Sequence, residues 1–211
     1  MAAAVLANRL RQAAALAACL WLSGQGKAGA VDYAPIPLAC LLANSDAVVV
    51  VNLPAEAQGE RYRVRATRVL RGALKPGDLD VVEPAPWRGT PPRFETREAL
   101  LFLRTGPGKT WEVLGPSGDG RIGLGATEAD VRGLSLPAAV AVEGKIGREA
   151  LLGPLAAAAD CFDFKRAPKK ATPCARCTAV RLKREKDRSA LHRALLAQLE
   201  GAQGKGLACL F

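Results

Sequence analysis

The chain has 211 residues, a formal net charge of +10 and a single histidine. This length suits one hydrophobic core with appendages rather than two full domains. With one histidine and 5% aromatic residues, the composition leaves little material for histidine-based catalysis.

The first thirty residues are typical of a secretory signal peptide. Arg9 and Arg11 form a positive segment, an apolar run follows at 13–22, and residues 28–30 read Ala-Gly-Ala before Val31. The run is too short to span a bilayer, and the small residues fit a cleavage site. We therefore expect a mature chain that begins at Val31, has no transmembrane segment and is exported to the periplasm or out of the cell.

A lipoprotein is the alternative reading of this segment. Residues 16–19 read Leu-Ala-Ala-Cys, which resembles a lipobox and would place a lipid on Cys19. The apolar run continues past Cys19 through residues 20–22. Simple cleavage after Ala30 explains this continuation better.

Residues 46–70 carry the clearest strand patterns. The run 46–52 (Asp-Ala-Val-Val-Val-Val-Asn) is mostly β-branched, which predicts a strand buried on both faces. Residues 61–67 alternate, with Tyr62, Val64 and Ala66 on one face and three arginines on the other. The alternation slips at 68–70, which indicates a bulge or the end of the strand.

Further short strands are expected at 79–82, 94–103, 110–114 and 121–124. Turns separate the strands at 75–78, 105–108 and 118–120, the last a Gly-Asp-Gly hairpin sequence, and a proline-rich loop spans 84–92. Short strands at such close spacing favour a small barrel or sandwich. We expect its interior to contain Val48, Val50, Val64, Leu101 and Leu103.

Helical segments flank these strands. They are expected at 35–44, from 127–130 onward, and at 147–161 with an interruption at Gly153-Pro154. A basic linker at 165–173 follows. Thr172 and Pro173 suit the N-cap and first turn of a last helix that ends near Gly201. Its half at 181–188 is expected to be solvated and held by Arg181–Glu185 and Lys183–Asp187 pairs.

A resemblance accompanies this pattern. The valine strand at 46–51, Arg-Val-Leu-Arg-Gly at 68–72, Lys-Pro-Gly-Asp at 75–78, the apolar run at 100–103 and Gly-Asp-Gly at 118–120 resemble exported bacterial domains related to tissue inhibitors of metalloproteinases. The likeness covers roughly residues 38–125. It implies an OB-like five-stranded barrel with helices alongside. Inhibitors of that family coordinate the protease zinc through a mature N-terminal cysteine, whereas Cys40 here is the tenth residue of the predicted mature chain.

The predicted fold is therefore mainly β with flanking helices, a small OB-like barrel plus a helical, basic C-terminal extension. Its segments are a signal peptide (1–30), the barrel domain (31–125), a helical flank (126–164) and the C-terminal extension (165–211).

Five cysteines remain after removal of the signal peptide: Cys40, Cys161, Cys174, Cys177 and Cys209. An odd number in an oxidising compartment predicts two disulfides and one free thiol. Spacing does not define the pairing. We expect Cys40 to pair with Cys161, because both flank the barrel on short helices, and the second pair to come from the other three.

Two other roles for these cysteines are open. Cys174-Ala-Arg-Cys177 is a C-x-x-C pair near an expected helix start, where helix N–H groups and Arg176 would lower a thiol pKa, so a thiol–disulfide redox protein is the alternative function. Cys161, Cys174, Cys177 and Cys209 could also bind zinc, although a zinc site usually contains two C-x-x-C pairs. We predict no metal and no cofactor.

No catalytic residues are predicted, and we expect a protein that is not an enzyme. His192 has no second histidine to work with, and the serines lack a nucleophile motif. Gly-Pro-Gly-Lys-Thr at 106–110 lacks the first glycine of a phosphate-binding loop and precedes a strand.

The positive charge lies in the C-terminal segment. Residues 165–205 contain twelve Lys and Arg residues against three acidic ones, whereas 31–164 is slightly acidic. The stripe of Arg61, Arg63 and Arg65 is interpreted as a solvated strand face. We predict a binding or inhibitor-type module whose partner is a protein or an anionic polymer or lipid surface, with no small-molecule substrate evident. The candidate polyanion-binding residues are Lys165, Arg166, Lys169, Lys170, Arg181, Lys183, Arg184, Lys186 and Arg188.

Overall fold

The computed structural model describes residues 35–57, 59–83, 94–115, 119–167, 170–202, 205–207 and 209. They belong to one compact unit, Pro35–Phe211. The predicted signal peptide, the lipobox at Cys19 and the loop at 84–92 lie outside the described residues.

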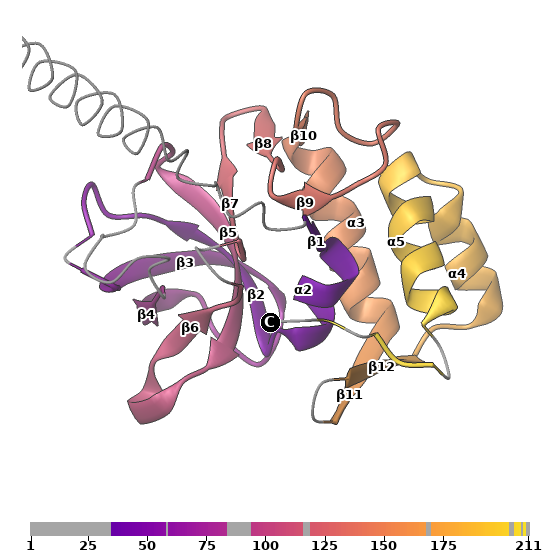
Figure 1. The fold of residues 1–211 in the computed structure, drawn as a ribbon, viewed down its shortest axis with the longest axis horizontal. Coiled ribbons are helices and arrows are strands. Elements are labelled where there is room, and N and C mark those ends of the chain that lie inside the picture. Colours follow the sequence, from indigo (N-terminus) through magenta and orange to yellow (C-terminus); the bar gives the residue numbers. More distant parts are fainter. Residues whose placement is uncertain are drawn as a thin grey trace, which may run out of the picture. The chain divides into compact units, whose positions relative to one another are not determined.

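Five strands close into a barrel (Figure 1). They are β2 (Ala47–Asn52), β3 (Arg61–Arg71), β4 (Gly77–Val82), β5 (Glu98–Thr105) and β6 (Trp111–Val113), in the order β2-β3-β4-β6-β5 with β5 paired back to β2. Neighbouring strands run antiparallel, except that β4 and β6 run parallel. The predicted mainly β fold with a small OB-like barrel and flanking helices is confirmed.

The two faces of β2 belong to two different cores. Val49 and Val51 lie in the barrel interior, whereas Val48 and Val50 pack in a second core with the helices. The prediction for Val48 and Val50 was therefore wrong, because a strand with valine on both faces has no polar residue that marks its outer side. The expected interior residues of β3 and β5 are confirmed, namely Val64, Leu101 and Leu103.

The slip in the alternation of β3 is a bulged region inside the strand. The register of β3 against β2 shifts twice, between Val48 and Val49 and between Val50 and Val51, and β3 continues to Arg71. Bulges bend a strand and increase its twist. They help this strand of 11 residues to curve around a closed barrel.

Strand β7 (Arg121–Leu124) pairs with β5 and not with β6 among the described residues. Leu103 of β5 is opposite Val113, and Leu101 is opposite Arg121, so β6 and β7 follow one another along the same edge of β5. The hairpin predicted at 118–120 is therefore wrong.

The sheet extends beyond the barrel through β8 (Glu128–Asp130) and β10 (Lys145–Gly147). A separate short parallel pair joins β1 (Ile36–Pro37) to β9 (Leu134–Ser135). The helix expected from 127–130 is wrong, because these residues form β8, whose Ala129 is buried opposite Leu124.

The helices lie on the side of the outer face of β2 and β5 (Figure 1). They are α2 (Leu38–Asn44), α3 (Arg148–Cys161), α4 (Ala179–Lys186) and α5 (Ala190–Gly201), and α4 is farthest from the sheet. The predictions of α2 and α3 are confirmed, although α3 passes through Pro154 without a break. Val48, Val50, Leu100 and Phe102 of the sheet share one core with the leucines of α2, α3 and α5.

The C-terminal extension differs from the long helix predicted at 172–200. Residues 162–167 and 170–175 form a hairpin of two strands, β11 (Phe162–Ala167) and β12 (Lys170–Ala175). Thr178 and Ser189 then cap two separate helices, because their side chains accept backbone N–H groups of Arg181 and His192. The segment expected to be a linker is therefore part of the hairpin.

Candidate functional site

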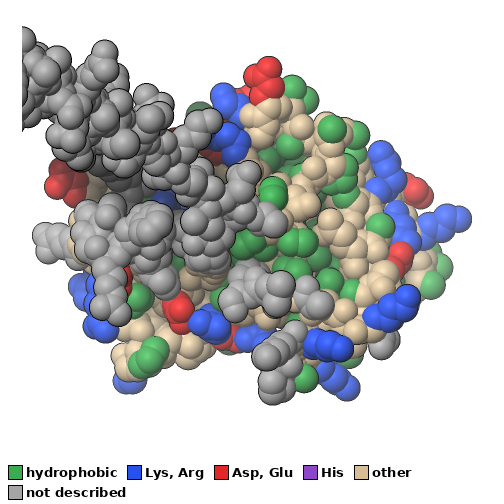
Figure 2. All heavy atoms as spheres, in the orientation of Figure 1, with side chains coloured by type: hydrophobic (Ala, Val, Ile, Leu, Met, Phe, Trp, Pro, Cys, Tyr) green, Lys and Arg blue, Asp and Glu red, His purple; other side chains and the backbone are tan. Residues whose placement is uncertain are grey.

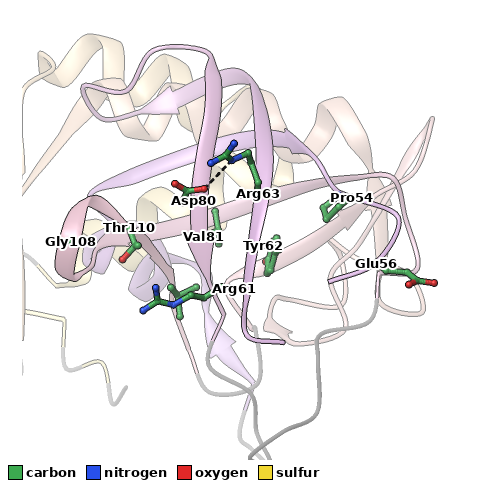
Figure 3. Close-up of a pocket in the computed structure, with 10 residues that line it drawn as sticks. Pro54, Glu56, Arg61, Tyr62, Arg63, Asp80, Val81, Gly108 and Thr110 are labelled. Atoms are coloured by element: carbon green, nitrogen blue, oxygen red, sulfur yellow. Dashed lines mark hydrogen bonds and ion pairs between the residues drawn. The ribbon is translucent and has the colours of Figure 1, made fainter. Parts of the chain in front are cut away.

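A groove lies on the barrel beside β3 and β4 (Figure 3). It has a volume of about 640 Å³ and lies between the segment after β2, with Pro54 and Glu56, and the turn before β6, with Gly108 and Thr110. Strand β4 pairs with β6 only at Val81 and Val82. The groove opens where this pairing stops.

Charged side chains of both signs line this groove. Arg63 Nε donates to Asp80 Oδ1 at 3.0 Å across the β3–β4 pair, and this hydrogen bond raises the pKa of Arg63. Arg61 and Glu56 have no ion-pair partner among the described residues. The groove thus presents donors and acceptors to a polar ligand. The arginine stripe of β3, Arg61, Arg63 and Arg65, is exposed as predicted. The sequence did not indicate that loops would lie on two sides of it.

A strained turn forms one wall of the groove. Pro107–Lys109 is a short 3₁₀ turn in which both Gly108 and Lys109 have φ of 66°. Left-handed backbone is unusual for a lysine. The Thr110 hydroxyl donates to Pro107 O at 2.7 Å and closes the turn. The segment that resembles a phosphate-binding loop is thus a tight turn that shapes the groove.

A buried polar network lies behind the groove. The Glu83 carboxylate, 3% exposed, accepts from the Tyr62 hydroxyl at 2.6 Å and from Arg121 Nε at 3.0 Å. The Arg121 guanidinium also lies 5.2 Å from the Phe94 ring centroid. Burial and then Glu83 raise the pKa of Tyr62. This network ties β3, the end of β4 and β7 together, and sequence reasoning missed it because its members are far apart in the chain.

A second, smaller groove of about 300 Å³ lies beside β7 and is lined by acidic and basic side chains. Asp130 pairs with Arg132, which lowers the pKa of Asp130, whereas burial raises the pKa of Asp119. The described residues contain no group of three His, Cys, Asp or Glu that could hold a metal ion.

The cysteines form two disulfides, Cys40–Cys209 and Cys161–Cys177, and Cys174 is free. Two disulfides and one free thiol agree with the prediction, but the expected Cys40–Cys161 pair is wrong. The pairing also contradicts a zinc site that uses Cys161, Cys177 and Cys209. Cys40 is buried in α2 and bonded to Cys209, so its sulfur is not available to a protease zinc.

The predicted basic residues fall into two groups. Some are engaged within the protein: Arg166 with Asp46, Arg181 with Asp160, Lys186 with Glu200 and Arg188 with Glu185. The expected pairs of Arg181 with Glu185 and of Lys183 with Asp187 do not form. Glu185 is buried and faces His192 instead. Four others are exposed and have no ion-pair partner in the described ranges: Lys165, Lys170, Lys183 and Arg184. Lys169 lies outside the described residues.

The junction of α4 and α5 brings together Ser189, His192 and Glu185. Ser189 Oγ lies 2.9 Å from His192 Nδ1, and His192 Nε2 lies 3.3 Å from Glu185 Oε2 without forming a hydrogen bond. His192 is only 6% exposed. Because Ser189 already caps α5 and neither groove contains the three residues, we interpret them as a packing cluster.

Across the described ranges, the helices are all too short or too polar to cross a bilayer. Neither a scan against protein-family models nor searches of curated proteins and of solved structures found a match for this chain. The resemblance to inhibitor-related domains therefore stays a prediction.

Proposed function

We propose that this protein is an exported, non-enzymatic binding module that contacts a polyanion at the periplasm or cell surface through its basic C-terminal surface. This surface comprises the exposed lysines and arginines of the β11–β12 hairpin and α4. The observation that carries the proposal is its set of four unpaired cations, Lys165, Lys170, Lys183 and Arg184.

The charge of these residues is free to act on a ligand because no acidic side chain in the described residues neutralises them. In Figure 2, Lys and Arg side chains stand along the side of the molecule formed by α4 and α5. An exposed Lys or Arg near an anionic membrane is worth on the order of 1 kcal/mol. Four simultaneous contacts would give measurable binding.

Export is supported by the signal-peptide pattern and by the two disulfides, which persist in oxidising compartments. The disulfides also support a fixed binding surface. Cys161–Cys177 joins the end of α3 to the segment before α4, and Cys40–Cys209 joins Cys209 to α2. The basic side chains therefore stand on a scaffold that is ordered before binding.

The test compares retention on heparin and on phosphatidylglycerol vesicles. The intact mature chain is measured beside a variant in which Lys165, Lys170, Lys183 and Arg184 are all replaced by Gln. A matched control loses four exposed charges elsewhere, with Gln at Arg65, Lys75, Arg97 and Lys109. Point variants are preferable to truncation after Asp163, because truncation would remove the core leucines of α5.

We expect the first variant to elute at lower salt than the intact protein and the control to elute close to it. Each phosphate-type contact contributes about 0.9 to the slope of log K against log salt, so four lost contacts lower the slope by about 3–4. Equal loss in both variants would assign the binding to net charge alone, and equal retention of all three proteins would overturn the proposal.

A second candidate function is thiol–disulfide chemistry at Cys174 and Cys177. The observation that favours it is the free Cys174 thiol, three residues before a disulfide-bonded cysteine. Because Cys177 is bonded to Cys161, Cys174 would first have to displace Cys161. Mass mapping of the exported protein after thiol blocking tests this: a Cys174–Cys177 bond in any fraction supports the redox function, and Cys161–Cys177 alone opposes it.

A further inference from the structure

Arg71 is an arginine without a partner at the seam between the barrel and the β11–β12 hairpin. It is the last residue of β3, opposite Val48 of β2. Its guanidinium carbon lies 4.6 Å from the centroid of the Phe164 ring on β11. Its Nη1 is buried without a hydrogen-bond acceptor, and no carboxylate in the described part of the chain pairs with it.

Contact with the Phe164 ring stabilises the charge of the Arg71 guanidinium but gives its N–H donors no acceptor. A guanidinium carries five N–H donors in a planar fork, whereas an aromatic face offers charge attraction and no acceptor atoms in the plane of the fork. Buried donors in folded proteins nearly always have an acceptor. The Nη1 donor of Arg71 is therefore left without the acceptor that a buried donor usually has, and an anionic or carbonyl group would supply it.

The neighbouring charges make the seam positive. Arg166 Nη1 bonds to Asp46 Oδ1 at 2.7 Å, and Arg176 Nε lies 3.2 Å from Asp163 Oδ2. Asp46 and Asp163 are thus each paired with another arginine, and Arg71 forms no ion pair with either of them. Burial and then the charge of Arg166 lower the pKa of Arg71 to about 10, so Arg71 is still protonated at neutral pH.

We propose that Arg71 binds one oxyanion group of the polyanion, a phosphate, sulfate or carboxylate, where the barrel meets the β11–β12 hairpin. This inference rests on the proposed polyanion function and gives it a specific contact point. Carboxylate and phosphate groups accept two parallel hydrogen bonds from the fork of arginine, which a lysine ammonium does not reproduce. Lys165 and Lys170 lie on the opposite face of this hairpin from Phe164, so they would contact the polymer separately from Arg71.

The first experiment measures thermal stabilisation by sodium sulfate against sodium chloride of equal ionic strength. It compares the mature protein with Arg71→Lys and with Arg65→Lys, a matched change of an exposed and unpaired arginine on the same strand. Because sulfate also stabilises folded proteins through its exclusion from their surface, we expect all three proteins to melt higher in sulfate than in chloride. We expect this difference to be larger in the wild type and in Arg65→Lys than in Arg71→Lys. An equal sulfate effect in all three proteins would overturn the inference.

A second measurement needs no variant. The Nε–Hε NMR signals of the arginines are followed in the wild-type protein during a sulfate titration. We expect the Arg71 signal to shift and saturate, while exposed arginines change only gradually with ionic strength. A signal of Arg71 that behaves like theirs would mean that no oxyanion binds there.

Binding to heparin and to vesicles distinguishes the possible sources of the oxyanion. It also distinguishes failure of the Arg71 site from failure of the polyanion function. Heparin presents sulfates and carboxylates, and phosphatidylglycerol vesicles present lipid phosphates, so the weakening caused by Arg71→Lys on one or the other identifies the source. If Arg71→Lys binds both as tightly as Arg65→Lys while the variant with four Gln substitutions does not bind, the polyanion function stands and the Arg71 site fails. If the variant with four substitutions binds normally, the polyanion function itself fails.

Discussion

Replacing Arg121 by methionine should destabilise the protein strongly, because the change leaves a buried carboxylate without its cation. The Glu83 side chain is 4% exposed, and the Arg121 side chain is 18% exposed. Arg121 donates to both carboxylate oxygens, from Nε at 3.0 Å to Oε2 and from Nη2 at 3.1 Å to Oε1. Methionine preserves much of the contact with Phe94 and removes the charge and the donors.

The expected loss in unfolding free energy is about 3–5 kcal/mol, the usual cost of breaking one side of a buried ion pair. Tyr62→Phe is a milder change, because the ring keeps its edge contact with Phe94 at 5.0 Å and only the hydroxyl donor to Glu83 is lost. A hydrogen bond to a charged group contributes about 1.5–3 kcal/mol.

The assay is equilibrium unfolding in urea at pH 7 with the disulfides intact. It includes Glu83→Gln and the double variant Arg121→Met with Glu83→Gln. If the cost of Arg121→Met comes from the Glu83 carboxylate left buried without a cation, the double variant should be more stable than the sum of the two single losses predicts. A loss below about 1 kcal/mol for Arg121→Met, or strictly additive losses, would contradict the argument.

Three further predictions concern the core, the disulfides and pH. Val50→Asp should cost about 3–5 kcal/mol, because Val50 is 2% exposed between barrel and helices; near-wild-type urea unfolding would disprove this. Removing Cys40–Cys209, which spans 169 residues, should cost more unfolding free energy than removing Cys161–Cys177, which spans 16. Loop entropy gives about 5 kcal/mol for the first and about 3 kcal/mol for the second. The reverse order in urea unfolding of the two double-Ala variants would contradict this account. Burial lowers the pKa of His192 below its usual 6.5, so unfolding free energy should fall as pH drops below 6.5, and His192→Gln should show less of this decline in unfolding at pH 7.5 and 5.5.

Strand positions could be predicted because they depend on local patterns. The alternation of Tyr62, Val64 and Ala66 with arginines identified both faces of β3, and the valine run identified a strand buried on both sides. The helices α2 and α3 were likewise visible as apolar segments with start signals. Where the local pattern was ambiguous the predictions failed, as for β8, whose three residues form a strand only because β7 and β10 lie on either side.

The last helix failed for a different reason. Thr172 and Pro173 are good residues for a helix start, but Thr178 and Ser189 are too, and the sequence alone does not rank them. Pairing of β12 with β11 over six residue pairs decides between them, because it holds 170–175 in an extended conformation. The basic residues were found by composition, but which of them are unpaired depends on the positions of Asp46, Asp160 and Glu200.

The sequence by itself thus determined the strand content, the number of disulfides and the location of the positive charge, because each depends on residue type and short-range spacing. The tertiary structure decided which cysteines pair, which valines face the barrel, and how Glu83 meets Tyr62 and Arg121. It also decided that Arg71 stacks on Phe164 with no acceptor. These features join residues that are distant in the chain, and their geometry follows from barrel closure and from the packing of the hairpin and helices on its outer face.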